Sequence, residues 1–197
     1  MRFLACVAVI AFACASSTPI ATKLHLKSEG GALYATIGGA EKKVTDTALK
    51  AWLIDSGREV LYSGRDGAGG YENEGQSLRL YDVSTRRTRK ILSEYFVITG
   101  VLELKTNSGK AAILVEMTDG GLGAAHVAVV DPKRGEVFST DGAKVVDRGA
   151  GTIVLGLYRD QDWEKLNANR EVRPFKTERY DLDELLLRPV IVNKVVR

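Results

Sequence analysis

The chain has 197 residues, of which 45% are hydrophobic and 27% are charged, with a formal net charge of +3. This composition is typical of a globular protein with a hydrophobic core, and it excludes a disordered or collagen-like chain. The length favours one domain, and the small net charge gives no support to nucleic-acid binding.

The N-terminus has the pattern of a signal peptide. An uncharged run of 13 residues, Phe3–Ala15, follows the basic second residue. The run is shorter than the roughly 20 residues that span a bilayer, and it ends in small residues that suit cleavage. We therefore expect an exported protein, periplasmic or extracellular, with a signal peptide over residues 1–21. Two cleavage sites stay open, one after Ala15 and one nearer Ala21.

Both cysteines, Cys6 and Cys14, lie in this leader. The mature domain is therefore expected to fold without disulfides or thiol chemistry. A second interpretation makes Cys14 the lipidated first residue of a lipoprotein. Ala11 stands where the bacterial lipobox prefers leucine, and this favours a chain without a lipid anchor. Membrane attachment is expected only in the lipoprotein interpretation, in which Cys14 is lipidated.

Residues 22–197 are expected to form one β-rich domain. Alternating apolar and polar residues, or short apolar runs between turn clusters, are typical of antiparallel strands. The tail from Tyr180 to Leu187 fits either the end of a strand or a short helix that stops before Pro189. In chain order, the predicted strands are Leu33–Ile37, Glu59–Ser63, Ser77–Val83, Lys90–Leu92, Phe96–Leu104, Ala111–Met117, His126–Val130, Glu136–Phe138 and Thr152–Tyr158.

Two motifs recur along the chain. Tyr81-Asp82-Val83 before a basic turn matches Val130-Asp131-Pro132 before another, and the two aspartates are 49 residues apart. Ser56-Gly57-Arg58 likewise matches Ser108-Gly109-Lys110, with the glycines 52 residues apart. Tyr180-Asp181-Leu182 follows another 50 residues on. The spacing predicts about three repeat-like units of antiparallel hairpins.

These residues resemble the β-propeller blades of the TolB and prolyl-oligopeptidase-domain kind, best over Trp52 to Leu92. Such blades carry an aromatic residue, a Ser-Pro-Asp-Gly-Lys turn, a Ser-x-Arg strand end and a Tyr-x-Asp strand. The corresponding segments here are Trp52, Asp55-Ser56-Gly57-Arg58, Ser63-Gly64-Arg65 and Tyr81-Asp82-Val83-Ser84-Thr85-Arg86. The resemblance implies the places of strands and turns, and it implies no activity.

The expected fold class is mainly β, built from antiparallel hairpin repeats. Propeller-like blades, a β-sandwich and an up-and-down barrel are the alternatives. Propellers close with about 4–8 blades of four strands, and a domain of this length has room for few blades, so an open array stays possible as well as a ring. Trp52 and Tyr81 are expected to be buried aromatic anchors of the first unit.

Few residues suggest chemistry. The two histidines, His25 and His126, show no spacing that would build a zinc site, and a Gly-x-Ser-x-Gly elbow and a P-loop are both missing. Asp160 to Glu164 alternates carboxylates as calcium loops do, but without the glycine at the sixth position, so we interpret it as a solvated turn. The basic run Arg86 to Lys90 fits the solvent side of a hairpin. We expect no metal and no cofactor.

One loop, Gly64 to Gly75, is too long and glycine-rich for a minimal hairpin. It carries Asp66, Glu72 and Glu74 beside Tyr71, which makes these four the candidate ligand-binding residues, for a sugar or a cation. Catalytic residues stay unassigned. The expected function is an exported, non-enzymatic β-protein with a binding or structural role at the cell envelope, its partner an envelope protein or glycan and not nucleic acid. The alternative is an exported hydrolase that uses carboxylates on a glycan or peptide.

Overall fold

The computed structural model describes residues 18–65, 76–94, 97–118, 123–168 and 170–191. Within these ranges the chain is mainly β, which confirms the predicted fold class, and its strands form four antiparallel sheets. Consecutive strands are neighbours in every sheet, as expected for hairpin repeats. No helix in these ranges is both long enough and apolar enough to cross a membrane.

The four sheets follow one another in sequence order. The first sheet has three strands, β1 (Ala21–Leu26), β2 (Gly31–Ile37) and β3 (Ala40–Ala48). The second and third have four each, namely β4 (Lys50–Ile54), β5 (Glu59–Arg65), β6 (Gln76–Asp82) and β7 (Arg87–Glu94), then β8 (Val97–Lys105), β9 (Ala111–Thr118), β10 (Ala125–Asp131) and β11 (Gly135–Asp141). The fourth has three, β12 (Ala143–Gly149), β13 (Thr152–Leu157) and β14 (Lys176–Asp181).

Two short helices belong to the fourth sheet's end of the chain. Helix α1 (Trp163–Asn167) lies between β13 and β14, and α2 (Leu182–Leu185) follows β14 directly. The ambiguous tail thus contains both predicted states, because β14 ends at Asp181 and α2 begins at the next residue.

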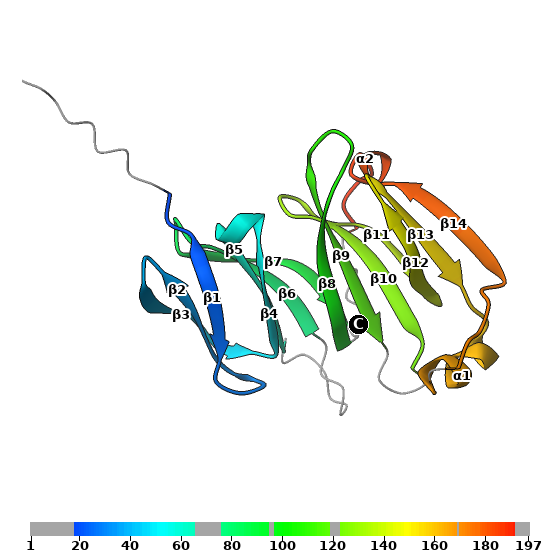
Figure 1. Cartoon of the computed structure of the whole chain (residues 1–197), viewed down its shortest axis with the longest axis horizontal. Helices are drawn as coiled ribbons and strands as arrows, with labels where there is room; N and C mark the ends of the chain where they lie inside the picture. Colours follow the sequence, from blue (N-terminus) through cyan, green and yellow to red (C-terminus); the bar gives the residue numbers. More distant parts are fainter. Residues whose placement is uncertain (1–17, 66–75, 95–96, 119–122, 169, 192–197) are drawn as a thin grey trace, which may run out of the picture.

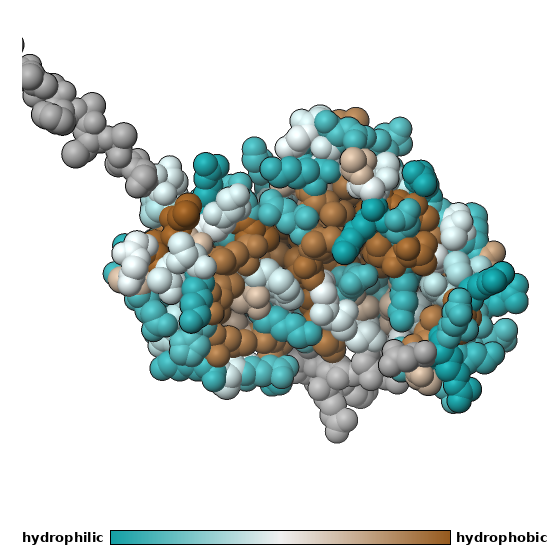
Figure 2. All heavy atoms as spheres, in the orientation of Figure 1, coloured by the Kyte–Doolittle hydropathy of each residue, from teal (hydrophilic) through white to brown (hydrophobic). Residues whose placement is uncertain are grey.

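A separate hydrophobic core fills each space between neighbouring sheets. Strand β6 shows how, because Tyr81 faces the first sheet while Leu78 and Leu80 face the third. Strand β10 repeats the pattern, with Val130 toward the second sheet and Val129 toward the fourth. The first and fourth sheets lie at opposite ends of the molecule (Figure 1). Apolar side chains form a band across the middle of the viewed face, flanked by hydrophilic ones (Figure 2).

The repeated aspartate has the same role in three sheets. Asp82 and Asp131 end the third strands of the second and third sheets, β6 and β10. Asp181 ends β14, the third strand of the fourth sheet. The Oδ1 atom of each accepts hydrogen bonds from the backbone N–H groups two and three residues further on, at 2.7–3.3 Å. An aspartate that bonds its own turn in this way fixes where a strand stops. The chain then forms β7 or β11 in two sheets, and α2 in the fourth.

Candidate functional site

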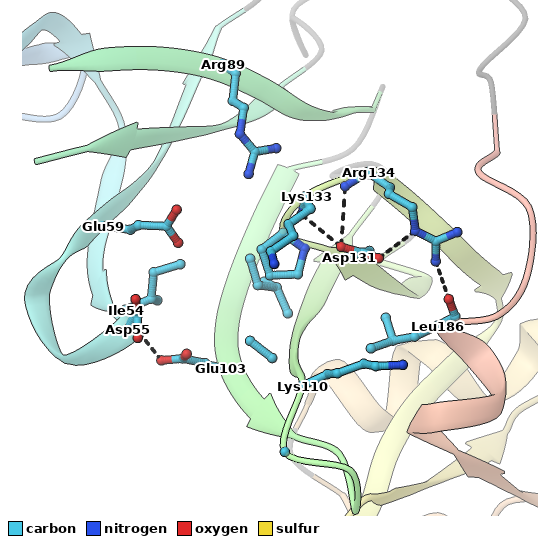
Figure 3. A pocket seen from close by; sticks show the side chains of 14 residues that line it. Ile54, Asp55, Glu59, Arg89, Glu103, Lys110, Asp131, Lys133, Arg134 and Leu186 are labelled. Carbon is cyan, nitrogen blue, oxygen red and sulfur yellow. Dashed lines mark hydrogen bonds and ion pairs between the residues drawn. The ribbon is translucent and has the colours of Figure 1, made fainter. Parts of the chain in front are cut away.

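A cleft of about 640 Å³ opens between the second and third sheets. Its floor is apolar and includes Ile54, Ile113 and Leu186, all of them buried. Its walls come from the turns that follow β4, β8 and β10, together with side chains of β5, β7 and β8. We call it the charged cleft, because ionisable side chains line most of its rim (Figure 3).

Three carboxylates, Asp55, Glu59 and Glu103, form one wall of the charged cleft (Figure 3). The backbone N–H of Asp55 donates to Glu103 Oε2 at 3.0 Å, which ties the end of β4 to β8 in the next sheet. Asp55 and Ser56 both have positive φ, 45° and 53°, a conformation that non-glycine residues seldom adopt. Such backbone strain persists only where surrounding contacts hold it.

Glu59 is the titratable group most altered by this wall. Burial raises the pKa of its carboxyl above the ordinary value, and the negative charges of Asp55, Asp82 and Glu103 raise it further. The guanidinium of Arg89 opposes this shift. Glu59 is therefore a carboxyl that holds its proton more readily than a solvated one.

The opposite wall is basic, with Lys110, Lys133 and Arg134 around Asp131, while Arg89 extends from β7, in the same sheet as Glu59 (Figure 3). Arg134 Nε donates to Asp131 Oδ2 at 2.6 Å, and its guanidinium also bonds the carbonyl groups of Leu186 and Arg188. Partial burial alone would raise the pKa of Asp131, but the bonds from Arg134 and from the turn hold that pKa below its ordinary value. The side chains of Arg134 and Asp131 thus stabilise the turn after β10 and its contact with the segment after α2.

Lys110 and Lys133 are exposed, and they give this wall its positive charge toward the cleft. The cleft therefore places a negative wall opposite a positive wall above an apolar floor. This arrangement can receive a ligand that bears both charges and an apolar part.

The four predicted ligand-binding residues, Asp66, Tyr71, Glu72 and Glu74, lie outside the described residues. Cys14 and the predicted signal-peptide core are outside the described ranges too.

The other residues considered for chemistry have structural surroundings. His126 is buried in β10, and its Nδ1 lies 2.7 Å from Asp141 Oδ1 on β11. The segment from Asp160 forms a short turn in which Asp162 Oδ2 accepts the N–H of Arg159, and Trp163 then enters the interior beside Tyr158. Among the residues with described positions, no three His, Cys, Asp or Glu side chains are placed to hold a metal ion.

The two aromatic anchors differ in their burial. Tyr81 is 5% exposed, as predicted. Trp52 is partly buried, because β4 is an edge strand of its sheet, and it packs against the core between the second and third sheets as an anchor would. Trp52 lines a second pocket, of about 460 Å³, whose other apolar residues include Leu24, Leu26 and Leu49.

The sequence did not single out Glu59, Glu103 or Lys133. Each stands in an ordinary strand or turn pattern, and Glu59 and Glu103 are 44 residues apart, so no local motif connects them. The sequence feature that could have indicated the cleft was the repeat of the two turns. Residues beside equivalent turns of neighbouring sheets lie at the same end of those sheets and can therefore meet. No protein-family model matches this chain, and no curated protein matches its sequence. Function is therefore inferred from the site.

Proposed function

We propose that this is an exported, non-enzymatic β-protein that binds a protein of the cell envelope through the charged cleft. The observation that carries the proposal is the pair of opposed walls, with Glu59 and Glu103 on one side and Lys110 and Lys133 on the other. A polypeptide segment offers both charges and an apolar side chain within a few residues. A neutral glycan would leave these charges without partners.

The charges of the cleft are better suited to selecting a partner at short range than to attracting one from a distance. Its positive and negative side chains nearly balance, and the whole chain carries a formal charge of only +3. Opposed charges at short range select the partner and its register, while burial of apolar surface on the floor supplies affinity. The leader-like N-terminus, Phe3–Ala15, is the reason for placing the partner in the envelope.

Site-directed photocrosslinking in the native host tests the proposal. A crosslinking amino acid replaces Pro132, an uncharged residue that lines the charged cleft, and in a matched strain it replaces Lys42, an exposed residue of β3 in the first sheet. We expect a discrete crosslinked protein from position 132 and none from position 42. Lys110→Glu, made in the position-132 strain, should abolish the product while far-UV circular dichroism stays unchanged. Equal crosslinking from both positions would refute the cleft as the binding site.

The second candidate is a hydrolase that uses carboxylates on a glycan or peptide. The raised pKa of Glu59 beside Glu103 favours it, because glycoside hydrolysis needs one carboxyl that keeps its proton and one that is ionised. The purified protein would be incubated with envelope glycan and with a peptide library. Hydrolysis that Glu59→Gln abolishes, with binding retained, would establish the enzyme. Absence of hydrolysis by the wild type would remove this candidate.

A further inference from the structure

Among the residues that the structure describes, the fourth sheet has no counterpart of the fourth strand found in the second and third sheets. In the second and third sheets the aspartate turn leads into a fourth strand that pairs with the third, as β7 pairs with β6 and β11 with β10. After Asp181 the chain forms α2 instead. Within the described part of the chain, β14 is therefore the last strand of its sheet, and it lies at the outer edge of the molecule (Figure 1).

The residues that could have formed the missing strand run elsewhere. The carbonyl of Arg188 accepts a bond from Arg134 at 3.2 Å, and the N–H of Ile191 donates to the carbonyl of Glu136 on β11 at 2.8 Å. The segment after α2 thus covers the outer edge of the third sheet. Among the described residues, no strand pairs with the outer edge of β14.

The hydrogen-bond pattern identifies the backbone groups on that edge. The N–H of Leu182 donates to the carbonyl of Gly151, in register with the pairing of β13 and β14. Alternate residues of an antiparallel strand direct their N–H and C=O groups to opposite sides. Tyr180, Glu178 and Lys176 therefore bond toward β13, whereas Thr177 and Arg179 present their backbone groups outward.

We propose that this edge pairs, antiparallel, with β14 of a second copy of the chain, centred on Thr177. The two three-stranded sheets then form one six-stranded sheet across a two-fold axis perpendicular to it. In this register Thr177 lies opposite Thr177 of the second copy, and Lys176 lies opposite Glu178 on both sides of the axis. Opposite charges and threonine pairs in directly facing positions both stabilise strand pairing.

The charges on β14 select this centre over its neighbours. A two-fold axis places the central residue opposite itself, so an axis at Lys176, Glu178 or Arg179 would set two like charges against each other. An axis at Tyr180 would bring α2 of each copy against the strand of the other, because α2 begins at Leu182. Thr177 is the position that avoids both conflicts.

The side chains of this edge also explain why pairing would be selective. Lys176 Nζ lies 2.6 Å from Glu178 Oε1 within one strand, and alternation puts both residues on the same face as Tyr180, which packs against the core between the third and fourth sheets. Charged residues on an edge strand discourage indiscriminate pairing. The same alternation of charge is complementary to a second, antiparallel copy.

Sedimentation velocity of the purified mature chain, from low micromolar to millimolar concentration, tests the proposal. We expect a reversible monomer–dimer equilibrium. Thr177→Pro should abolish the dimer without unfolding the monomer, because it removes an N–H that points away from β13. Lys176→Glu should weaken the dimer about tenfold, because it converts two attractive pairs into repulsive ones.

Charge exchange gives the decisive control. The double variant Lys176→Glu, Glu178→Lys restores opposite charges both within each strand and across the axis, so its dimer should regain nearly wild-type strength. A wild type that stays monomeric throughout would overturn the proposal, as would a dimer that survives Thr177→Pro or is not rescued by the exchange. Crosslinking from position 132 in the charged cleft is independent of either result.

Discussion

Gly57 lies against the backbone of Ala21, so that a Cβ on Gly57 would stand 2.2 Å from the carbonyl oxygen of Ala21. The contact joins the turn between β4 and β5 to the first residue of β1. Gly57 also has a φ of +84°, in the left-handed region that favours glycine. Two requirements therefore coincide at one residue.

Gly57→Ala should destabilise the protein more than a positive φ alone would. Strain of this kind costs about 1–3 kcal/mol, and the clash with Ala21 adds to it. Gly109 is the matched control, because its φ is +80° and a Cβ added there would meet nothing within 4 Å. Urea unfolding of the two alanine variants should give a clearly larger loss for Gly57→Ala. Equal losses would mean that β1 moves aside without cost.

The same contact bears on signal cleavage. Ala21 is 3% exposed and belongs to the core between the first two sheets. We expect cleavage after Ala15, which keeps Ala21 in the mature chain. Intact mass and N-terminal sequencing of the exported protein would show this. A mature chain that begins at Thr22 would contradict it, and a lipid-modified Cys14 would establish the lipoprotein alternative.

Loss of a repeated turn should cost a measurable part of the folding free energy. Asp82→Ala removes three hydrogen bonds, from the backbone N–H groups of Ser84 and Thr85 and from the Ser84 hydroxyl. A net cost of about 1–2 kcal/mol is expected. Asp46→Ala is the control, because Asp46 makes only an exposed ion pair with Lys43 and should matter little.

The cost of Asp82→Ala should depend on pH. Hydrogen bonds from Ser84 and Thr85 hold the pKa of Asp82 below its ordinary value of 3.8. At a pH just below 3.8 the unfolded chain binds this proton before the folded chain does, so stability falls as the pH drops through this range. The difference in unfolding free energy between wild type and Asp82→Ala should therefore have its full value at neutral pH and become smaller in acid. A pH-independent difference in urea unfolding would contradict the assignment.

Glu59→Gln should have the opposite pH dependence. Burial raises the pKa of Glu59, so its ionised form opposes folding. The folding stability should fall as the pH rises from 4.5 through the raised pKa of Glu59. The neutral glutamine of the variant should remove this loss of stability at neutral pH. We expect a higher melting temperature for Glu59→Gln at pH 7 and no gain near pH 4. Glu29→Gln, at an exposed turn, is the control and should leave the melting temperature unchanged at both values.

The sequence predicted those strands whose neighbours lie on both sides. Strands β6, β9 and β10 are buried in the second and third sheets, so their apolar residues stand close together and are easily recognised. Strands β3 and β12 were missed because charged or polar residues fill much of their length, whereas the edge strands β8 and β11 were predicted because they carry more apolar residues. The turn between β10 and β11 was predicted because proline, glycine and aspartate mark it.

The charged cleft could not be predicted from local patterns. Glu59 and Glu103 reach it from two sheets, and their proximity depends on how those sheets stack. The degree of Trp52 burial could not be predicted for a related reason, because it depends on which strand is outermost and not on its place in a hairpin. The long-range features that the sequence displayed directly were the two repeats, that of Asp82 with Asp131 and that of Gly57 with Gly109.

Because the hydrophobic cores among the described residues each join two sheets that are neighbours in sequence, the molecule resembles a linear array more than a single interlocked core. In such arrays stability is roughly a sum of unit and interface contributions, and end units must present a polar outer surface. Thr177 and Arg179 on β14 supply polar side chains of this kind at the fourth sheet. Evolution could then have lengthened or shortened this protein by whole sheets, provided that the terminal unit kept its polar outer surface.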